Sequence, residues 1–243
     1  RRVLFRSDLN LIAPVFHEGE LVAYAANIAH HADVGGMVPG SEAAVCESIF
    51  QEGLRLPPVR LVREGELNQD IVDIVVLNSR TPDERLGDLR AQVAANRSAL
   101  GNLESLFARY GTETVNATFD AFLDSTERRF RGAVGRLPDG RYTSVEFLSG
   151  DVQGELSPIA VAMEVREDAL HFDLTGTAAE LTTARNIPKQ AVLATIYTVA
   201  KALLDPAVPA NEGYFRAFDV ALPKRTLVAP ESPAPVGCRS ISC

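Results

Sequence analysis

The sequence predicts a mixed α/β protein, because segments with strand composition and segments with the spacing of amphipathic helices come in blocks rather than in strict alternation. We expect an N-terminal hairpin that leads into a loop, then long amphipathic helices, a mostly antiparallel block of strands and a further helix. The chain has 243 residues, of which 46% are hydrophobic. That is enough for one large core or two small ones.

Two strands are predicted near the N-terminus, over residues 9–16 and 20–28, because both segments are rich in strand-forming residues. His17-Glu18-Gly19 separates them and is typical of a short hairpin loop with a glycine. The second strand leads directly into residues 30–40, where glycines and a proline predict an irregular loop.

A long helix is predicted over 82–110, because Thr81-Pro82-Asp83-Glu84 reads as a capping box with proline at the first helical position, and Gly111 ends the apolar pattern. A shorter helix is predicted over 42–53, with Ser41 as its N-cap. The other predicted elements are helices over 68–78, 113–135 and 189–204, and strands over 141–148, 157–166 and 169–175 with a turn at Glu167-Asp168.

The composition excludes several classes of partner. The formal net charge of −8 argues against nucleic acid, and no apolar run approaches the length needed to span a membrane. Cys46, Cys238 and Cys243 share no metal-ligand spacing, and their odd number and scatter fit a reducing compartment. The first residues lack the apolar core and cleavage site of a signal peptide, so we expect a cytoplasmic protein.

Both ends differ from those of a complete protein. The chain starts with arginine, and residues 1–7 (Arg-Arg-Val-Leu-Phe-Arg-Ser) resemble the translation of a sequencing-adapter oligonucleotide, so we expect them to be non-native. The chain stops at Ile241-Ser242-Cys243 with neither a terminal element nor a polar tail. We therefore expect residues 8–243 to be an internal fragment of a longer chain.

The segment Ala29–Gly36 (Ala-His-His-Ala-Asp-Val-Gly-Gly) holds two of the four histidines. Imidazole and carboxylate together are ligands that a borderline divalent metal prefers. On a strand, the side chains of His30 and His31 point to opposite faces, so at most one of them faces a given metal unless the backbone turns there. The other interpretation is a loop in which one histidine donates hydrogen bonds to the backbone. Asp33 is then a ligand, a partner that fixes an imidazole tautomer, or a turn residue.

Asp8 opens the first predicted strand, and by itself it reads as a solvated carboxylate at a strand edge. In an antiparallel hairpin closed near Gly19, Asp8 and His30 lie eleven residues on either side of the turn, so the strands bring them to the same end. A carboxylate and an imidazole that converge there make half a metal site.

Arg55 and Arg90 are candidate substrate-binding residues, because a guanidinium group holds a carboxylate or imide oxygen through two hydrogen bonds. The alternative, which the general weakness of such signals favours, is that they pair with Glu52 and Asp88 on helix faces. The sequence contains no dinucleotide fingerprint, phosphate-binding loop or nucleophile elbow. If the enzyme uses ATP, this chain does not visibly bind it.

The segment around the two histidines resembles the hydantoinase B family, the HyuB-like subunits of hydantoinase, 5-oxoprolinase, caprolactamase and acetone carboxylase. Besides residues 29–41, four further stretches agree in order with this family: IFQEGLRLPPV (49–59), RTPDER (80–85), GDLRAQ (87–92) and FDLTGT (172–177). Several motifs in the right order are more specific than any one of them. The resemblance covers the chain from Asp8 to its end and makes residues 8–243 an internal fragment of a hydantoinase B domain.

The resemblance implies a metal-dependent subunit of an ATP-dependent hydrolase that opens a cyclic amide or imide, of the hydantoin, 5-oxoproline or lactam type. In the family, ATP is bound by a HyuA-like partner subunit or domain, and the HyuB-like subunit holds a divalent metal, with Mn and Zn both accepting its ligands. Those ligands are an upstream acid, an HxxD pair and a later histidine. Asp8 matches the aspartate of HxxD and His30 the later histidine, whereas the HxxD histidine falls on Phe5 and the upstream acid precedes the chain. His31 and Asp33 are expected to serve catalysis in supporting or substrate-facing roles.

With about half of that ligand set, this chain alone is expected to bind metal weakly or not at all and to be inactive. Two other functions remain open at this point. The chain is part of an acetone carboxylase-type ATP-dependent carboxylase, or it is a non-catalytic module that docks the ATP-binding partner.

Overall fold

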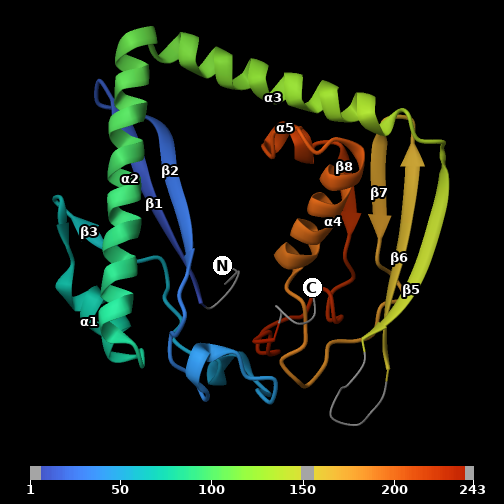
Figure 1. Cartoon of the computed structure of the whole chain (residues 1–243), viewed down its shortest axis with the longest axis horizontal. Coiled ribbons are helices and arrows are strands. Elements are labelled where there is room, and N and C mark those ends of the chain that lie inside the picture. Colours follow the sequence, from blue (N-terminus) through green and yellow to red (C-terminus); the bar gives the residue numbers. More distant parts are fainter. Residues whose placement is uncertain (1–6, 149–155, 239–243) are drawn as a thin grey trace. The chain divides into compact units, whose positions relative to one another are not determined.

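The computed structural model describes residues 7–148 and 156–238 and confirms the mixed α/β class (Figure 1). Residues 1–6 of the adapter-like segment, including Phe5, and also Cys243 lie outside the described residues, so the expectations for them stay predictions. The chain divides into two compact units, one formed by residues 1–46 and 50–116 and the other by residues 47–49 and 117–243.

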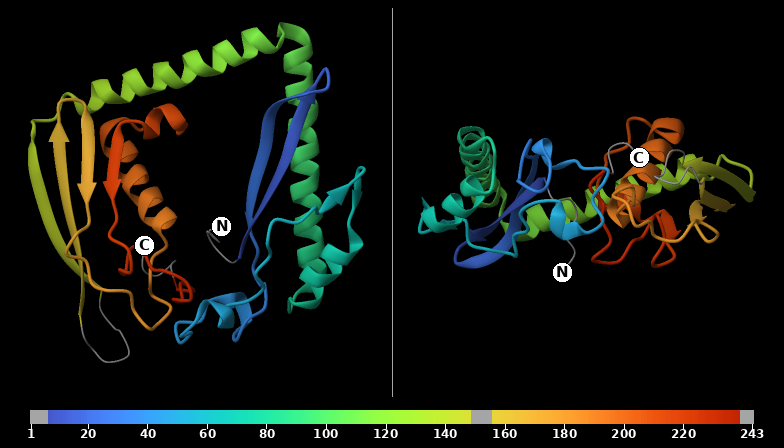
Figure 2. Two further views of the ribbon diagram at one scale, coloured as in Figure 1. Left: turned by 180° about the vertical axis from the view of Figure 1, so that it is seen from behind. Right: turned by 90° about the horizontal axis from the view of Figure 1, so that it is seen from below.

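The first unit contains the predicted hairpin, formed by β1 (Asp8–His17) and β2 (Glu20–His30). It lies along helix α2 (Pro82–Tyr110), as the two directions of view in Figures 1 and 2 show. The turn consists of Glu18 and Gly19, with φ angles of 52° and 85°. Two successive positive φ angles give the turn type that matches the twist of hairpin strands.

A β-bulge interrupts the hairpin between Val15 and Phe16. Val15 lies opposite Ala23 and Phe16 opposite Leu21, so Val22 is an extra residue on β2. A bulge of this kind shifts the pairing of every residue beyond it by one position.

The two faces of the hairpin differ in burial. On the face toward α2, Val15 and Ala25 are buried, and the His17 ring stacks on Phe107 with ring centroids 5.9 Å apart. The opposite face is exposed although it carries large apolar side chains: Ile12, Phe16, Leu21, Tyr24 and Ile28. Only one face of this hairpin therefore contributes to the core of its unit.

The first unit also contains α1 (Gln69–Leu77), which agrees with the predicted helix over 68–78, and a small hairpin that the sequence did not lead us to expect. This hairpin pairs β3 (Val62–Arg63) with β4 (Glu66–Leu67). Its turn, Glu64-Gly65, has φ angles of 51° and 83° and so repeats the geometry of the first hairpin.

The predicted helix over 42–53 is wrong. In its place the chain makes two single 3-10 turns, Pro39–Ser41 and Ile49–Gln51, joined by irregular backbone. The reason is long-range hydrogen bonding: Leu54 N–H donates to the carbonyl of Val34, and the carbonyl of Gln51 accepts from Met37 N–H. Backbone groups used in this way are not available for a helix.

Ser41 is therefore no helix N-cap. Its hydroxyl accepts from Val34 N–H and donates to the carbonyl of Gly35. Helix α2 begins at Pro82 and ends at Tyr110, as predicted, but the capping box is wrong because the Thr81 side chain makes no capping hydrogen bond. Instead, Thr81 N–H donates to the hydroxyl of Ser79. Proline at the first helical position is enough to start the helix here.

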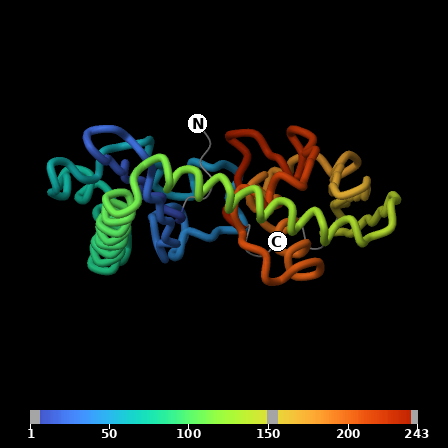
Figure 3. The backbone as a smooth tube through the Cα atoms, turned by 90° about the horizontal axis from the view of Figure 1, so that it is seen from above, coloured from blue at the N-terminus to red at the C-terminus, as the bar shows by residue number. Residues whose placement is uncertain are grey.

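The second unit contains a four-stranded sheet in the order β5-β6-β7-β8. Its strands are β5 (Gly140–Leu148), β6 (Ser157–Arg166), β7 (Ala169–Asp173) and β8 (Phe218–Ala221). The first three are antiparallel, as predicted, and β8 is parallel to β7. A parallel pair needs a crossover connection, which α4 (Lys189–Leu204) and the short α5 (Glu212–Phe215) supply, and which can be followed in Figure 3.

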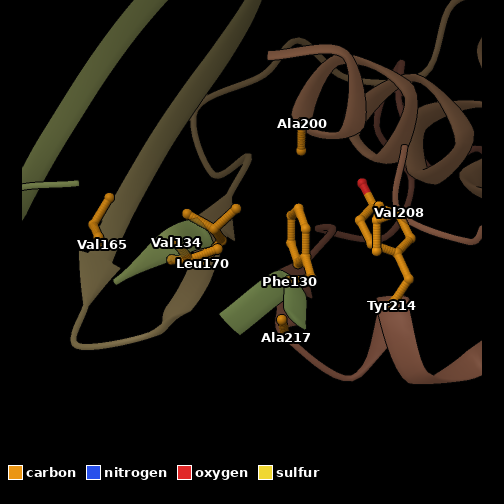
Figure 4. Close-up of a cluster of buried hydrophobic side chains, with 8 residues drawn as sticks. All are labelled: Phe130, Val134, Val165, Leu170, Ala200, Val208, Tyr214 and Ala217. Atoms are coloured by element: carbon orange, nitrogen blue, oxygen red, sulfur yellow. The ribbon is translucent and has the colours of Figure 1, made fainter. Parts of the chain in front are cut away.

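The core of the second unit lies between the sheet and its helices. Helix α3 (Thr112–Val134) and α4 agree closely with the predicted helices. The buried cluster drawn in Figure 4 consists of Phe130, Val134, Val165, Leu170, Ala200, Val208, Tyr214 and Ala217. Phe130 is at its centre, edge-to-face with Tyr214 at a centroid distance of 4.5 Å and stacked on Phe218 at 5.3 Å. Aromatic pairs at these distances add to the hydrophobic burial that holds the unit together.

None of the helices in the described residues combines the length and the apolar character that crossing a membrane requires.

Candidate functional site

Asp8 and His30 are directly opposite each other at the open end of the β1–β2 hairpin, which confirms the pairing predicted from the sequence. The Nδ1 atom of His30 is 2.9 Å from Oδ1 of Asp8 and 3.3 Å from the hydroxyl of Ser7. The His30 side chain is 56% exposed and that of Asp8 15% exposed. The pair is therefore preorganised by the ladder and open to solvent on the imidazole side.

His31 follows His30 but points the other way, as the alternation of a strand predicts. It is fully buried, and its Nε2 atom is 3.1 Å from Oε1 of Gln92 on α2. Its Nδ1 atom is 3.9 Å from a carboxylate oxygen of Asp88 and has no hydrogen-bond partner among the described residues. Burial lowers the pKa of His31, and this effect outweighs the hydrogen bond to Gln92, which raises it.

Asp33 organises the glycine-rich loop. Its buried carboxylate accepts from the backbone N–H groups of Gly35, Gly40 and Arg80 and from the guanidinium group of Arg80 at 3.0 Å. Burial alone would raise the pKa of Asp33, but these hydrogen bonds together lower it to about 2. Asp33 is thus a turn residue that holds the loop, which was one of the three roles open from the sequence.

Arg80 completes this arrangement. Besides Asp33, its guanidinium group donates to the carbonyls of Val38 at 3.0 Å and Gly36 at 2.7 Å. Gly36 has a φ of 87°, and a Cβ atom there would come within 2.7 Å of the backbone of Glu52. The loop is therefore fixed from both sides, by charge on one and by close backbone packing on the other.

Arg55 and Arg90, the candidate substrate-binding residues, lie in different parts of the first unit. Arg55 lies over the ring of Phe50 at 5.0 Å, a cation–π arrangement. Arg90 is exposed on α2. The interpretation that Arg90 pairs with Asp88 is wrong, because Asp88 is 2.8 Å from the buried Arg85 instead. Residues two apart on a helix do not face each other, whereas residues three apart do.

The polar residues that surround His31 were not predicted from the sequence. Arg85, Gln92 and Asn96 are buried on α2, and Asn27 of β2 hydrogen-bonds to both amides. The signal that could have found them is their spacing. Arg85, Gln92 and Asn96 lie three, four or seven residues from Leu89, on the apolar face of the predicted helix.

The donor atoms at the end of the hairpin form only part of a metal site. Within residues 7–148 and 156–238, no group of three or more His, Cys, Asp and Glu side chains is close enough to hold a metal ion. Asp8 and His30 supply one carboxylate and one imidazole. Phe5, where the family resemblance places a third ligand, lies outside the described residues.

The sequence model of the Hydantoinase B/oxoprolinase family matches residues 6–243 of this chain. The HyuB-type subunit of a putative D-/L-hydantoinase from Pseudomonas sp. (strain NS671) is 33% identical over 245 residues, which cover 96% of the chain and 41% of that protein. The acetophenone carboxylase delta subunit of Aromatoleum aromaticum is 28% identical over 234 residues, 95% of the chain and 34% of that protein.

Among solved structures, the ATP-dependent caprolactamase from Pseudomonas jessenii superposes with a TM-score of 0.89 at 30% identity, covering 94% of this chain and 40% of that one. The chain spans about two fifths of the length of the curated relatives it matches first. A family model that matches nearly the whole chain, close relatives and a shared fold agree with one another. The chain belongs to the hydantoinase B/oxoprolinase family.

Proposed function

We propose that this chain is part of the metal-bearing subunit of an ATP-dependent enzyme that opens a cyclic amide or imide, and that Asp8 and His30 are two of the metal's ligands. The observation that carries this proposal is the Asp8–His30 pair, 2.9 Å apart at the open end of a hairpin. The names of the relatives, a D-/L-hydantoinase and an ATP-dependent caprolactamase, support the substrate class.

The donor set fits a divalent cation. Two bonds of about 2.1 Å that meet at a right angle separate their donor atoms by about 3.0 Å. The Nδ1 of His30 and the Oδ1 of Asp8 are 2.9 Å apart, so both can bind one cation without rearrangement of the backbone. Imidazole with carboxylate suits Mn²⁺ and Zn²⁺ alike. Two ligands hold such an ion weakly, which agrees with the expectation that the chain alone binds metal poorly.

When bound, a divalent metal supplies Lewis-acid polarisation of an amide or imidate oxygen, or a hydroxide at neutral pH. Amides need such help because resonance makes both the carbonyl and the leaving nitrogen unreactive. Phosphorylation of the ring oxygen turns a poor electrophile into a good one. We propose that ATP serves this purpose and is bound by a HyuA-like partner subunit or domain, since no phosphate-binding loop occurs in this chain.

The chain's own residues position this site. Asp8 and His30 present their donors, and Ser7 holds the Nδ1 side of His30. We propose that His31 and Asp33 serve catalysis without touching substrate, because both side chains are buried. Asp33 does so through the loop that it ties to Arg80, and His31 through its contact with α2. Arg55 and Arg90 stay candidates for substrate binding, both on the first unit.

The hydrolase is favoured over the carboxylase. The hydantoinase and caprolactamase relatives are 33% and 30% identical to the chain, whereas the acetophenone carboxylase subunit is 28% identical. The difference is small, so the substrate assay includes both reactions.

Metal binding tests the ligand assignment in this chain directly. Phe5→His places a histidine three residues before Asp8, where the family resemblance expects one, and it should tighten Mn²⁺ or Zn²⁺ binding by about tenfold or more in calorimetric titration, equivalent to about 1.4 kcal/mol. Arg6→His is the matched control and should not. In the Phe5→His background, His30→Ala and Asp8→Asn should abolish the gain.

A second control pair comes from the other unit, where His171 Nδ1 lies 3.4 Å from Asp219. His171→Ala should leave the affinity unchanged. Equal affinity in the Phe5→His and Arg6→His variants, or a gain that survives His30→Ala, would refute the assignment.

Turnover tests the reaction. The protein is purified with an ATP-binding subunit of the family, and ATP hydrolysis is measured with hydantoin, with 5-oxoproline, and with acetone plus bicarbonate. We expect turnover on a cyclic amide that is lost on His30→Ala. Turnover only with acetone and bicarbonate would replace the hydrolase by the carboxylase, and turnover independent of His30 would remove the metal site from the mechanism.

A further inference from the structure

A chain of buried amides joins helix α2 to both strands of the β1–β2 hairpin. Gln92 donates from Nε2 to the carbonyl of Leu9 at 2.7 Å and to Oδ1 of Asn27 at 2.9 Å. Asn27 donates from Nδ2 to the carbonyl of Gln92 and to Oδ1 of Asn96, each at 2.9 Å. Asn96 in turn donates to the carbonyl of Leu11 at 3.1 Å. Each side-chain oxygen and nitrogen of the three amides thus has a partner.

The backbone fixes the orientation of each amide in this chain. A carbonyl oxygen only accepts hydrogen bonds, so the group next to Leu9 O must be the NH₂ of Gln92, and the group next to Leu11 O must be the NH₂ of Asn96. The side-chain oxygen of Gln92 is then the atom 3.1 Å from His31. Because that oxygen also only accepts, Nε2 of His31 must carry the hydrogen.

His31 is therefore held as the Nε2–H tautomer, with an unprotonated Nδ1. The residues that face it from α2 are Arg85, Asp88 and Gln92. The Arg85 guanidinium is 2.8 Å from Asp88, which reduces the pull of that carboxylate on Nδ1. The arrangement depends on Gln92, since it is the residue that bonds to the ring.

The bonds of Gln92 flank the Asp8–His30 pair. One goes to Leu9, the residue after Asp8, and another to His31, the residue after His30. The backbone N–H of His31 also donates to the carbonyl of Ser7 at 2.6 Å. Both strands are thus attached to α2 one residue from the pair, on the face of the hairpin opposite to it.

We propose that Gln92 is the positioning residue of the site: it holds His31 as the Nε2–H tautomer and, through Leu9 and His31, fixes the strand ends that present Asp8 and His30. The hydrogen-bond part of this proposal stands on the geometry alone. Only its consequence for metal affinity rests on the proposed function.

Nitrogen-15 NMR of the histidine rings tests the hydrogen-bond part without metal. The chain has four histidines, so the His17→Gln, His30→Gln and His171→Gln variants assign the signals. His31 should show the pattern of an Nε2–H tautomer. In Gln92→Met, which keeps side-chain length without polar groups, His31 should become a mixture of tautomers and the His30 signals should shift.

Asn96→Leu is the matched control, because it removes a buried amide one helical turn further along α2 and leaves the bond between Gln92 and His31. It should lower stability but keep the His31 tautomer. The proposal is overturned if unsubstituted His31 is the Nδ1–H tautomer, or if Gln92→Met leaves the signals of both His30 and His31 unchanged. If Gln92→Met does not fold, Gln92→Glu keeps an oxygen facing His31 and removes the two donated bonds, so the His31 tautomer should persist while the His30 signals shift.

The metal readout separates the two proposals. In the Phe5→His background, Gln92→Met should weaken Mn²⁺ or Zn²⁺ binding by about tenfold or more, as loss of supporting partners does at metal sites, and Asn96→Leu by less than about threefold. If the Phe5→His chain binds no metal, the proposed function fails while the tautomer result decides the role of Gln92. If metal binds and Gln92→Met leaves its affinity unchanged, the positioning role fails while the ligand assignment holds.

Discussion

Replacement of Asp33 by asparagine should destabilise the first unit by an amount that depends on pH. In the folded chain the pKa of Asp33 is about 2, against 3.8 for the unperturbed side chain. A group whose pKa is lower in the folded state stabilises that state above its unfolded pKa, and this contribution is lost as the pH falls through the folded pKa. A difference of nearly two units corresponds to about 2 kcal/mol at pH 5 to 7 and about 1 kcal/mol at pH 3.

The side chain of Asp33 is only 5% exposed, so solvent screening does not reduce this figure appreciably. Asparagine has the same shape but offers one acceptor oxygen in place of two and carries no charge for Arg80. Urea unfolding of the chain and of Asp33→Asn, followed by circular dichroism at pH 7, 5 and 3, measures the gap in the free energy of unfolding. Exchange of the Gly35 and Gly40 amide hydrogens reports the same loss locally.

Asp73→Asn is the control, because Asp73 is an exposed carboxylate that bonds only to the side chain of Gln69. It should change the stability by less than about 0.5 kcal/mol at each pH. A gap for Asp33→Asn that is as large at pH 3 as at pH 7 would show that the carboxylate charge is not what holds the loop, and a gap below about 0.5 kcal/mol at pH 7 would refute the reasoning altogether.

Three further predictions concern stability. Gly36→Ala should destabilise the chain by about 2 kcal/mol more than Gly19→Ala in urea unfolding, since both glycines have φ near 86° but only Gly36 faces crowded backbone, and equal losses would contradict this. Arg80→Lys should cost about 1 kcal/mol and speed exchange of the loop amides, because lysine lacks the planar fork that binds three acceptors, and unchanged exchange would rule out this role. Phe130→Ala should lower the free energy of unfolding of the second unit by about 3–5 kcal/mol, and a loss below about 1 kcal/mol would place its core elsewhere.

Elements with strong local signals could be predicted from the sequence. The helices Pro82–Tyr110 and Lys189–Leu204 were predicted to the residue, because a proline begins the first and Asp205-Pro206 ends the second. Helix 42–53 failed because its backbone hydrogen bonds go to residues far away in the sequence, such as Val34 and Met37. No local pattern records such partners.

The candidate site divides in the same way. The Asp8–His30 pair followed from strand pairing, which depends on the turn and the chain direction. The role of Gln92 did not, because a glutamine at an apolar spacing reads as an imperfection of a helix face until the partner strand is in place. Asp33 lies between these cases: a turn role could be foreseen, but its partner Arg80 is 47 residues away.

The bulge in the hairpin makes the length of β2 subject to natural selection at the candidate site. Without the extra residue Val22, a regular ladder from the same two-residue turn would place Asp8 opposite Ala29. His30 would then be out of register with its carboxylate. Over evolutionary time, an insertion or deletion at the bulge, eight residues from His30, should survive only with a second length change in the same hairpin that restores the pairing.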